Sequence, residues 1–193
     1  NIYNLTAIIA TAELLGLERL EVLTIASQLE SVSGRFEYIV SKDGVTAIID
    51  YAHTPDALKN VLETINDIRT GAENVLTVVG CGGDRDTLKR PKMAHIATQL
   101  STQVIFTSDN PRTENPQTIL EEMELGVLPE NEIKTLTVLN RKQAIKTACK
   151  LSKTGDIILI AGKGHENYQE INGVRTHFDD LEEVKNCFNQ LKK

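Results

Sequence analysis

Asp109, Asn110 and Arg112 place a carboxylate, an amide and a guanidinium within one short segment of the chain. The segment follows an apolar, strand-like run at 104–108, and Pro111 fixes its own φ and favours an extended conformation at Asn110. A stiff loop at the end of a strand is therefore expected. Its three polar groups suit a ligand that carries both an ammonium and a carboxylate, which describes an amino acid. An Asx-type turn with an exposed arginine is the alternative interpretation.

Three further polar clusters also follow apolar, strand-like runs. In open α/β sheets, ligands bind beyond the carboxyl ends of the strands, so such clusters are expected to line one rim of the sheet. Each cluster taken singly can be an ordinary turn, but together they predict a binding site. The clusters are 50–55 (DYAHTP), 80–86 (GCGGDRD) and 162–166 (GKGHE).

The glycine-rich cluster lets the backbone approach a ligand closely, and Arg85 offers a fork for a carboxylate or phosphate. A flexible loop in which Arg85 is merely paired with Asp84 is the alternative. In the last cluster Glu166 suits an ammonium group, whereas the sequence does not decide whether Lys163 and His165 bind a ligand or have a structural role. The sequence contains no GxxxxGK[ST] phosphate-binding loop.

Strand-like and helical segments alternate over most of the chain, which predicts an α/β fold: a mostly parallel sheet with helices on both faces. SKDG and Asn172-Gly173 each separate two β-like runs and predict hairpins, the second between 168–171 and 174–178. The other expected strands are 36–40, 45–49, 75–79, 104–108, 134–138 and 156–160, and the expected helices are 55–69, 91–100, 116–124, 141–151 and one capped by Asp179.

Two helices, at 3–15 and 18–29, are expected before the alternating part, with Gly16 as the stop between them. Their apolar faces look cut from a neighbouring domain. We therefore predict that 1–31 is the end of a preceding domain and that 32–193 is a domain of its own. The chain begins with Asn rather than Met, and we expect it to be an internal piece of a longer protein.

Composition narrows the function classes. With 40% hydrophobic and 25% charged residues the chain is globular, and its net charge of −6 without a basic stripe argues against a nucleic-acid binder. No apolar run approaches the roughly 18 residues that span a bilayer, so no membrane insertion is expected. The three cysteines form no CxxC pair and the four histidines show no metal-ligand spacing. We expect no metal site, no disulfide and a reducing cytoplasm.

The motifs DYAHTPDAL, GCGGDRD…KRPKM, DNPRTE and GKGHE, in this order and spacing, resemble the C-terminal part of the Mur ligase family. The resemblance covers essentially the whole chain: Asn1–Asn4 is similar to the end of the family's central ATPase domain, and 34–37 (GRFE) to the opening of its C-terminal domain. It implies a Rossmann-like C-terminal domain. Thr87-Leu88 stand where a Lys-Gly-like pair is expected, a departure that affects local loop shape.

The family resemblance also implies an activity: ATP-dependent amide formation through an acyl phosphate in bacterial peptidoglycan synthesis. ATP and Mg²⁺ would be the cofactors. The phosphate-binding loop, most magnesium ligands and the UDP-binding domain would lie in the remaining domains of the parent ligase. The chain alone is therefore expected to be inactive, carrying only part of an active site.

The resemblance assigns two sets of binding residues and no catalytic residue. Asp50 would accept a hydrogen bond from a ribose hydroxyl, and Arg35 would contact phosphate, although surface ion pairing is the alternative for Arg35. The residues implied for the amino acid are Arg85, Asp109, Asn110, Pro111, Arg112, Gly162 and Glu166, and those for ATP are Asn4, Arg35, Asp50 and His53.

The choice of amino acid can be argued from charge. meso-Diaminopimelate differs from lysine by a second carboxylate, which Arg112 would pair with while Arg85 lies nearby; lysine would leave both arginines uncompensated. The DNPR sequence also resembles that of diaminopimelate-adding members of the family. We therefore predict meso-diaminopimelate, joined to UDP-N-acetylmuramoyl-L-Ala-D-Glu.

Other functions stay open at this point. A lysine-adding ligase of the same kind would need the arginines to be compensated in another way. The ligase that adds D-Ala-D-Ala and folylpolyglutamate synthetase share the family but fit the DNPR loop less well. A free-standing module that senses an amino acid is the alternative from a different class, and the two N-terminal helices argue against it.

Overall fold

The computed structural model of the protein describes residues 2–29 and 32–193. The chain divides into two compact units, Asn1–Val32 and Ser33–Lys193. The predicted boundary at residue 31, like Asn1, lies outside the described residues, and the assignment of the first unit to an ATPase domain stays a prediction.

The first unit is a pair of helices, α1 (Ile2–Leu14) and α2 (Arg19–Ser27), as predicted. Gly16 separates them with a φ of +87°, a conformation that suits glycine at a helix end. Among residues 4–29 Val22 alone is buried, while Leu14 is 88% exposed. These two helices therefore do not build a core of their own.

The second unit is an α/β domain with a six-stranded sheet, in the order β1-β2-β6-β3-β4-β5. The β1–β2 pair is the predicted antiparallel hairpin, and all other neighbours are parallel, which confirms the predicted fold class. The strands are β1 (Glu37–Val40), β2 (Thr46–Asp50), β3 (Val75–Val79), β4 (Gln103–Phe106), β5 (Thr135–Thr137) and β6 (Ile157–Ala161).

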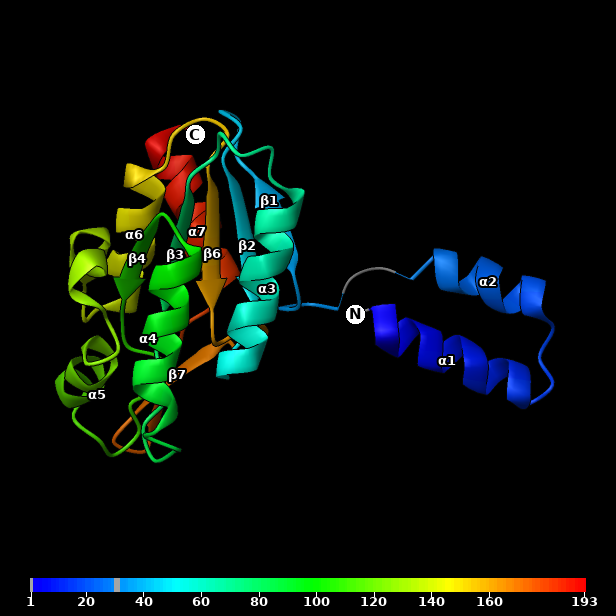
Figure 1. The fold of residues 1–193 in the computed structure, drawn as a ribbon, viewed down its shortest axis with the longest axis horizontal. Coiled ribbons are helices and arrows are strands. Elements are labelled where there is room, and N and C mark those ends of the chain that lie inside the picture. Colours follow the sequence, from blue (N-terminus) through cyan, green and yellow to red (C-terminus); the bar gives the residue numbers. More distant parts are fainter. Residues whose placement is uncertain (1, 30–31) are drawn as a thin grey trace. The chain divides into compact units, whose positions relative to one another are not determined.

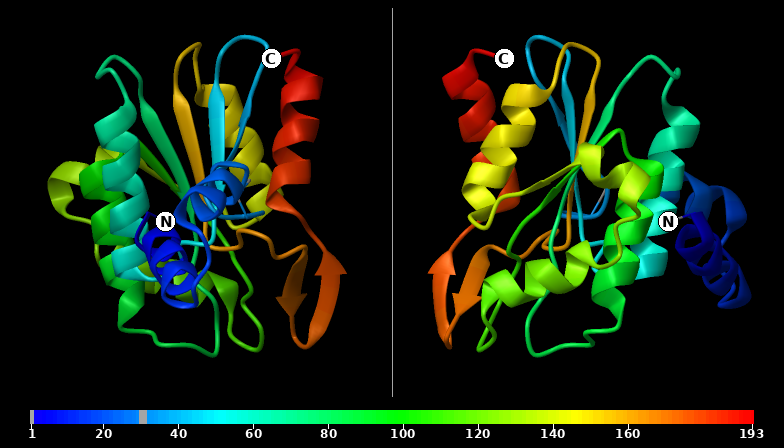
Figure 2. Two further views of the ribbon diagram at one scale, coloured as in Figure 1. Left: turned by 90° about the vertical axis from the view of Figure 1, so that its right-hand side faces the viewer. Right: turned by 60° about the vertical axis from the view of Figure 1, so that its left-hand side comes forward.

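Helices cover both faces of this sheet (Figures 1 and 2). Successive strand residues point to opposite faces, so Val75 and Val79 of β3 join one apolar core and Leu76 and Val78 join the other. The first core includes α3 (Pro55–Ile68), α4 (Lys89–Leu100) and α5 (Pro116–Glu124), and the second includes α6 (Arg141–Leu151) and α7 (Asp180–Leu191). Because β2 to β6 run parallel to one another between these two cores, their carboxyl ends lie at the same end of the unit.

Two local features differ from the sequence expectation. Helix α4 begins at Lys89 rather than at Pro91, because proline is tolerated within the first turn, where its missing N–H has no helical partner. A 3₁₀ helix, η1 (Pro129–Lys134), precedes β5 and was not expected, and β5 is confined to 135–137.

The second predicted hairpin is present as β7 (Tyr168–Ile171) and β8 (Val174–His177), joined by Asn172 and Gly173 with φ of 50° and 76°. Positive φ at both turn positions is what an Asn-Gly hairpin turn requires. The hairpin lies at the end of the unit where β6 terminates (Figure 1). Within the described part of the chain, every helix is too short or too polar to cross a bilayer.

Candidate functional site

A pocket of about 590 Å³ lies at the carboxyl ends of the parallel strands. All four polar clusters of the sequence contribute to its wall, because β2, β3, β4 and β6 end at the same edge of the sheet. The lining residues are Tyr51, His53, Thr54, Pro55, Gly82, Arg85, Asp86, Lys89, Lys92, Asp109, Asn110, Arg112, Gly162, Glu166 and Tyr168.

The pocket wall carries charges of both signs, the arrangement that a zwitterionic ligand requires. The cations are Arg85, Lys89, Lys92 and Arg112, and the carboxylates are Asp86, Asp109 and Glu166. The pocket thus brings together Gly162 and the five residues whose side chains were expected to hold the amino acid, namely Arg85, Asp109, Asn110, Arg112 and Glu166. Pro111 is buried and shapes the loop from beneath: its carbonyl accepts the Glu114 N–H at 3.0 Å.

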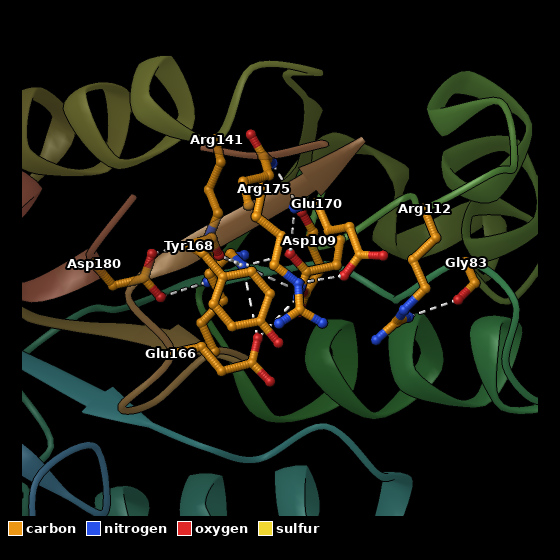
Figure 3. A network of polar contacts seen from close by, with 12 residues as sticks. Gly83, Asp109, Arg112, Arg141, Glu166, Tyr168, Glu170, Arg175 and Asp180 are labelled. Carbon is orange, nitrogen blue, oxygen red and sulfur yellow. Dashed lines mark hydrogen bonds and ion pairs between the residues drawn. The ribbon is translucent and has the colours of Figure 1, made fainter. Parts of the chain in front are cut away.

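Arg112 is held in a fixed position by its backbone and by its side chain. Its φ of 51° is unusual for a residue with a side chain. Its N–H donates to Glu170 O at 3.0 Å and its carbonyl accepts from Asn172 N–H at 2.6 Å, so the hairpin clamps the loop. Nη1 donates to Gly83 O at 2.6 Å, which aims the half-buried guanidinium along the pocket wall (Figure 3).

Asp109 packs against Gly162 at the floor of the pocket. A Cβ on Gly162 would lie 2.7 Å from Asp109 Oδ2, and the φ of 116° there also favours glycine. Gln169 Nε2 donates to Asp109 O at 2.7 Å, a second link between this loop and the hairpin. Glycine at 162 is therefore needed for the carboxylate to reach its position.

Asn110 and Glu166 form a hydrogen-bonded pair from two different loops. Asn110 Nδ2 donates to Glu166 Oε2 at 2.8 Å, and Asn110 is 2% exposed. Burial raises the pKa of the neighbouring Tyr51 phenol, with Glu166 and Asp109 acting in the same direction. The Tyr51 hydroxyl is therefore a hydrogen-bond donor beside the two carboxylates, and ionisation of the phenol is disfavoured further.

The sequence left Lys163 and His165 undecided; the structure exposes His165 and buries Lys163 completely beneath the pocket. The Nζ of Lys163 donates to Asn110 Oδ1 at 2.9 Å and to Tyr168 O at 2.6 Å. It also lies 3.6 Å from Asp109 Oδ1. A lysine between two glycines is usually exposed, so only the three-dimensional arrangement reveals this burial.

Deeper still, Arg141 and Asp180 form a bidentate ion pair with both side chains fully buried. Arg141 Nη2 lies 2.7 Å from Asp180 Oδ2 and Nε lies 2.8 Å from Oδ1. Nη2 also donates to Ala161 O at 3.1 Å, at the end of β6. The pair joins the starts of α6 and α7 to the strand that leads into the 162–166 cluster (Figure 3).

The loop that carries Arg85 is tied to the neighbouring loop by residues the sequence did not single out. Thr113 Oγ1 donates to Asp84 Oδ1 at 2.7 Å, and buried Arg90 pairs with Glu114 at 2.9 Å. Arg85 itself is exposed and donates only weakly, at 3.4 Å, to Asp84 O. The alternative in which the Asp84 and Arg85 side chains pair is not what the loop shows; Asp84 binds Thr113 instead.

Among the residues expected on the nucleotide side, His53 lines the pocket and Asp50 directly precedes Tyr51 of its wall, while Asn4 belongs to the first unit. The Arg35 guanidinium lies 5.6 Å from the centroid of the Tyr51 ring, and the Tyr51 and His53 rings are 4.5 Å apart. Asp50 Oδ2 accepts from Phe36 N–H at 2.8 Å, and burial raises the pKa of this carboxyl.

Close packing of Gly83 against Pro111 leads to a stability prediction. A Cβ on Gly83 would lie 2.0 Å from the Pro111 carbonyl oxygen, so the two loops would have to separate. We expect Gly83→Ala to lower the free energy of unfolding by about 1–3 kcal/mol, measured by urea unfolding. Gly82→Ala is the matched control, since its Cβ would lie 2.9 Å from Arg112 Nη1, the end of a side chain, and 3.7 Å from the nearest backbone atom, Asn110 O, so that no backbone segments have to separate. Equal losses for the two variants would contradict this prediction.

Comparisons with known proteins identify the family of this chain. The family profile described as "Mur ligase, glutamate ligase domain" matches residues 34–164. Two similar proteins are named UDP-N-acetylmuramoyl-L-alanyl-D-glutamate--2,6-diaminopimelate ligase. The one from Cytophaga hutchinsonii is 58% identical over 100% of this chain and 40% of its own length. The one from Bacteroides thetaiotaomicron is 55% identical over 98% of this chain and 39% of its own length.

Solved structures of this family are similar to the chain in fold. A structure of a UDP-N-acetylmuramoyl-L-alanyl-D-glutamate--2,6-diaminopimelate ligase is 40% identical, with a TM-score of 0.77, over 100% of this chain and 39% of that chain. The UDP-N-acetylmuramate-alanine ligase of Thermotoga maritima shares the fold at 18% identity and a TM-score of 0.67, over 100% of this chain and 37% of that one. This chain spans about 40% of the length of the curated relatives it matches. With two-thirds of its residues inside the family profile, the chain belongs to the Mur ligase family.

Proposed function

We propose that this chain is the C-terminal part of an ATP-dependent ligase that adds meso-2,6-diaminopimelate to UDP-N-acetylmuramoyl-L-Ala-D-Glu in the bacterial cytoplasm. One observation carries the proposal: a single pocket gathers the Asp109, Asn110 and Arg112 loop with Glu166 and Arg85. The names of the two relatives support the same reaction. Residues 1–31 would then be the end of the central ATPase domain.

The pocket suits the two ends of diaminopimelate. Asp109 and Glu166 supply negative charge for an ammonium group, and Arg112 supplies a planar fork for the distal carboxylate. Lysine lacks that carboxylate and would leave the Arg112 guanidinium without a charged partner, which disfavours it. In the reaction, the chain's contribution is to bind and orient the amino acid so that its amine can attack the acyl phosphate.

The nucleotide-side residues fit ATP by their chemistry. Arg35 can pair with phosphate, the Asp50 carboxylate can accept from a ribose hydroxyl, and His53 lies on the pocket wall. Mg²⁺ would neutralise the phosphates during transfer. Following the family resemblance, most of its ligands would lie in the remaining domains of the parent ligase. Within residues 2–29 and 32–193, no three His, Cys, Asp or Glu side chains are grouped to hold a metal ion.

The proposal is tested by ADP release from the full-length protein that carries this chain. The assay contains UDP-N-acetylmuramoyl-L-Ala-D-Glu, ATP and Mg²⁺, with meso-diaminopimelate or L-lysine as the amino acid. We expect release with diaminopimelate and little with lysine. Release with lysine alone would keep the ligase and overturn the assignment of Arg112. No release with either would favour another acceptor or an amino-acid-binding module, and the isolated chain is expected to release none.

A further inference from the structure

Lys163 is a buried cation that none of the assignments above uses. Its side chain is 0% exposed, although an ammonium group is costly to bury unless it is paired and hydrogen-bonded. Burial lowers its pKa, while Asp109 acts in the opposite direction. Arg141 lowers the pKa further, and Asp180 and Glu166 raise it. Such a group is retained only where its partners stabilise the charge, and those partners line the amino-acid pocket.

The first consequence of Lys163 is the orientation of the Asn110 amide. An ammonium group can only donate, so Lys163 Nζ, 2.9 Å away, requires the amide oxygen Oδ1 on its side. Glu170 N–H donates to the same oxygen at 2.9 Å. The amide nitrogen is then forced to the opposite side, where it donates to Glu166 Oε2 at 2.8 Å. Lys163 thus fixes Glu166 through Asn110.

The second consequence concerns charge. Lys163 Nζ lies 3.6 Å from Asp109 Oδ1 and 3.8 Å from Glu166 Oε2. A cation placed between two carboxylates offsets the repulsion between them. Lys163 thus balances one of the two negative charges, and the group of three presents one net negative charge to the ligand's ammonium.

We propose that Lys163 is a positioning residue of the amino-acid site, which orients Asn110 and balances part of the negative charge of Asp109 and Glu166 for the incoming amino acid. The inference rests on the proposed function, since it assigns Lys163 to the site where the amino acid would bind. It predicts that the charge of Lys163, rather than its volume, determines the KM for the amino acid.

Steady-state kinetics of the full-length protein separate these roles. Lys163→Met keeps the length of the side chain and removes the charge. We expect it to raise the KM for meso-diaminopimelate by roughly thirtyfold or more, with a change below about threefold in the KM for ATP. Lys193→Met is the matched control, because the Nζ of Lys193 also donates to a main-chain carbonyl, Cys149 O at 2.8 Å, but lies outside the pocket wall. It should leave both KM values unchanged.

Chemical rescue supplies a second readout. Lys163→Ala removes the three methylenes and the ammonium that n-propylammonium can replace. We expect n-propylammonium to lower the KM for diaminopimelate in Lys163→Ala, and 1-propanol or tetramethylammonium at equal concentration to have no effect. Equal rescue by 1-propanol, or an unchanged KM in Lys163→Met with only a lower Tm, would overturn the proposal.

A structural readout distinguishes this inference from the proposed function. If the unaltered protein releases no ADP with diaminopimelate, the function is wrong, whatever Lys163 does. A crystal structure of this chain with Lys163→Met then decides the positioning role. We expect the Asn110 amide to leave its present orientation and the bond to Glu166 to break; an unchanged Asn110 and Glu166 would overturn the proposal.

Discussion

Arg112→Ala is expected to raise the KM for meso-diaminopimelate by roughly thirtyfold to a few thousandfold, measured as ADP release by the full-length protein. The range follows from the cost of truncating one partner of a buried, hydrogen-bonded charge pair, about 2–5 kcal/mol. The guanidinium is half-buried and anchored on Gly83 O at 2.6 Å, so little of its ordering has to occur on binding. The KM for ATP should change little.

Two further variants show where the distal carboxylate binds. Arg112→Lys keeps the charge and loses the fork, so it should recover only part of the affinity. Arg85→Ala should have the smaller effect, because Arg85 is exposed and the hydrogen bond from its side chain to Asp84 O is 3.4 Å long. A larger loss for Arg85→Ala than for Arg112→Ala would place the carboxylate at Arg85 and contradict the present assignment.

Arg141→Met is expected to destabilise the second unit by about 3–5 kcal/mol, because it leaves the Asp180 carboxylate buried without its partner. In a domain of this size the change corresponds to a fall in Tm of roughly 10 °C. Thermal unfolding of this chain, followed by circular dichroism, measures it. The loss of the bond to Ala161 O adds to the effect at the end of β6.

An exposed ion pair between the same two helices serves as the control. Lys142 Nζ lies 3.0 Å from Glu183 Oε1 and also joins α6 to α7, but the lysine side chain is 57% exposed. Lys142→Met should therefore change Tm little. Arg141→Met combined with Asp180→Leu should recover much of the loss, since no buried charge is then left unpaired. Similar Tm values for Arg141→Met and Lys142→Met would refute this reasoning.

The elements of the second unit follow from local patterns in the sequence. Apolar runs such as 75–79 and 156–160 and the turn at Asn172-Gly173 lie close to where the structure has them. The order of the strands could not be obtained in this way. Placing β6 between β2 and β3 depends on packing between distant segments, and no short-range signal encodes it.

The candidate site, like the fold, could be predicted from the sequence only in part. The residues that face the pocket carry chemical groups that are visible in the sequence, such as the Arg112 guanidinium and the Glu166 carboxylate. Of the residues that hold them, Lys163 was left undecided and Arg141 was missed, because long charged side chains are usually exposed and their burial is decided by tertiary packing. The contact between the hairpin and Arg112 was also missed, because it joins segments that are distant in the sequence.

The strand order has a consequence for how the second unit folds. Strand β6, at residues 157–161, lies between β2, which precedes it by 111 residues in the pairing register, and β3, which precedes it by 82; β2 and β3 do not pair with each other. During synthesis the two halves of the sheet therefore lack their common neighbour until β6 has left the ribosome. Pairings of such long range form slowly, and unpaired strand edges promote aggregation. Cooperative folding of this unit therefore requires β6, which is the last strand of the six-stranded sheet in chain order. The pocket at the carboxyl ends of these strands cannot form before β6 has been made.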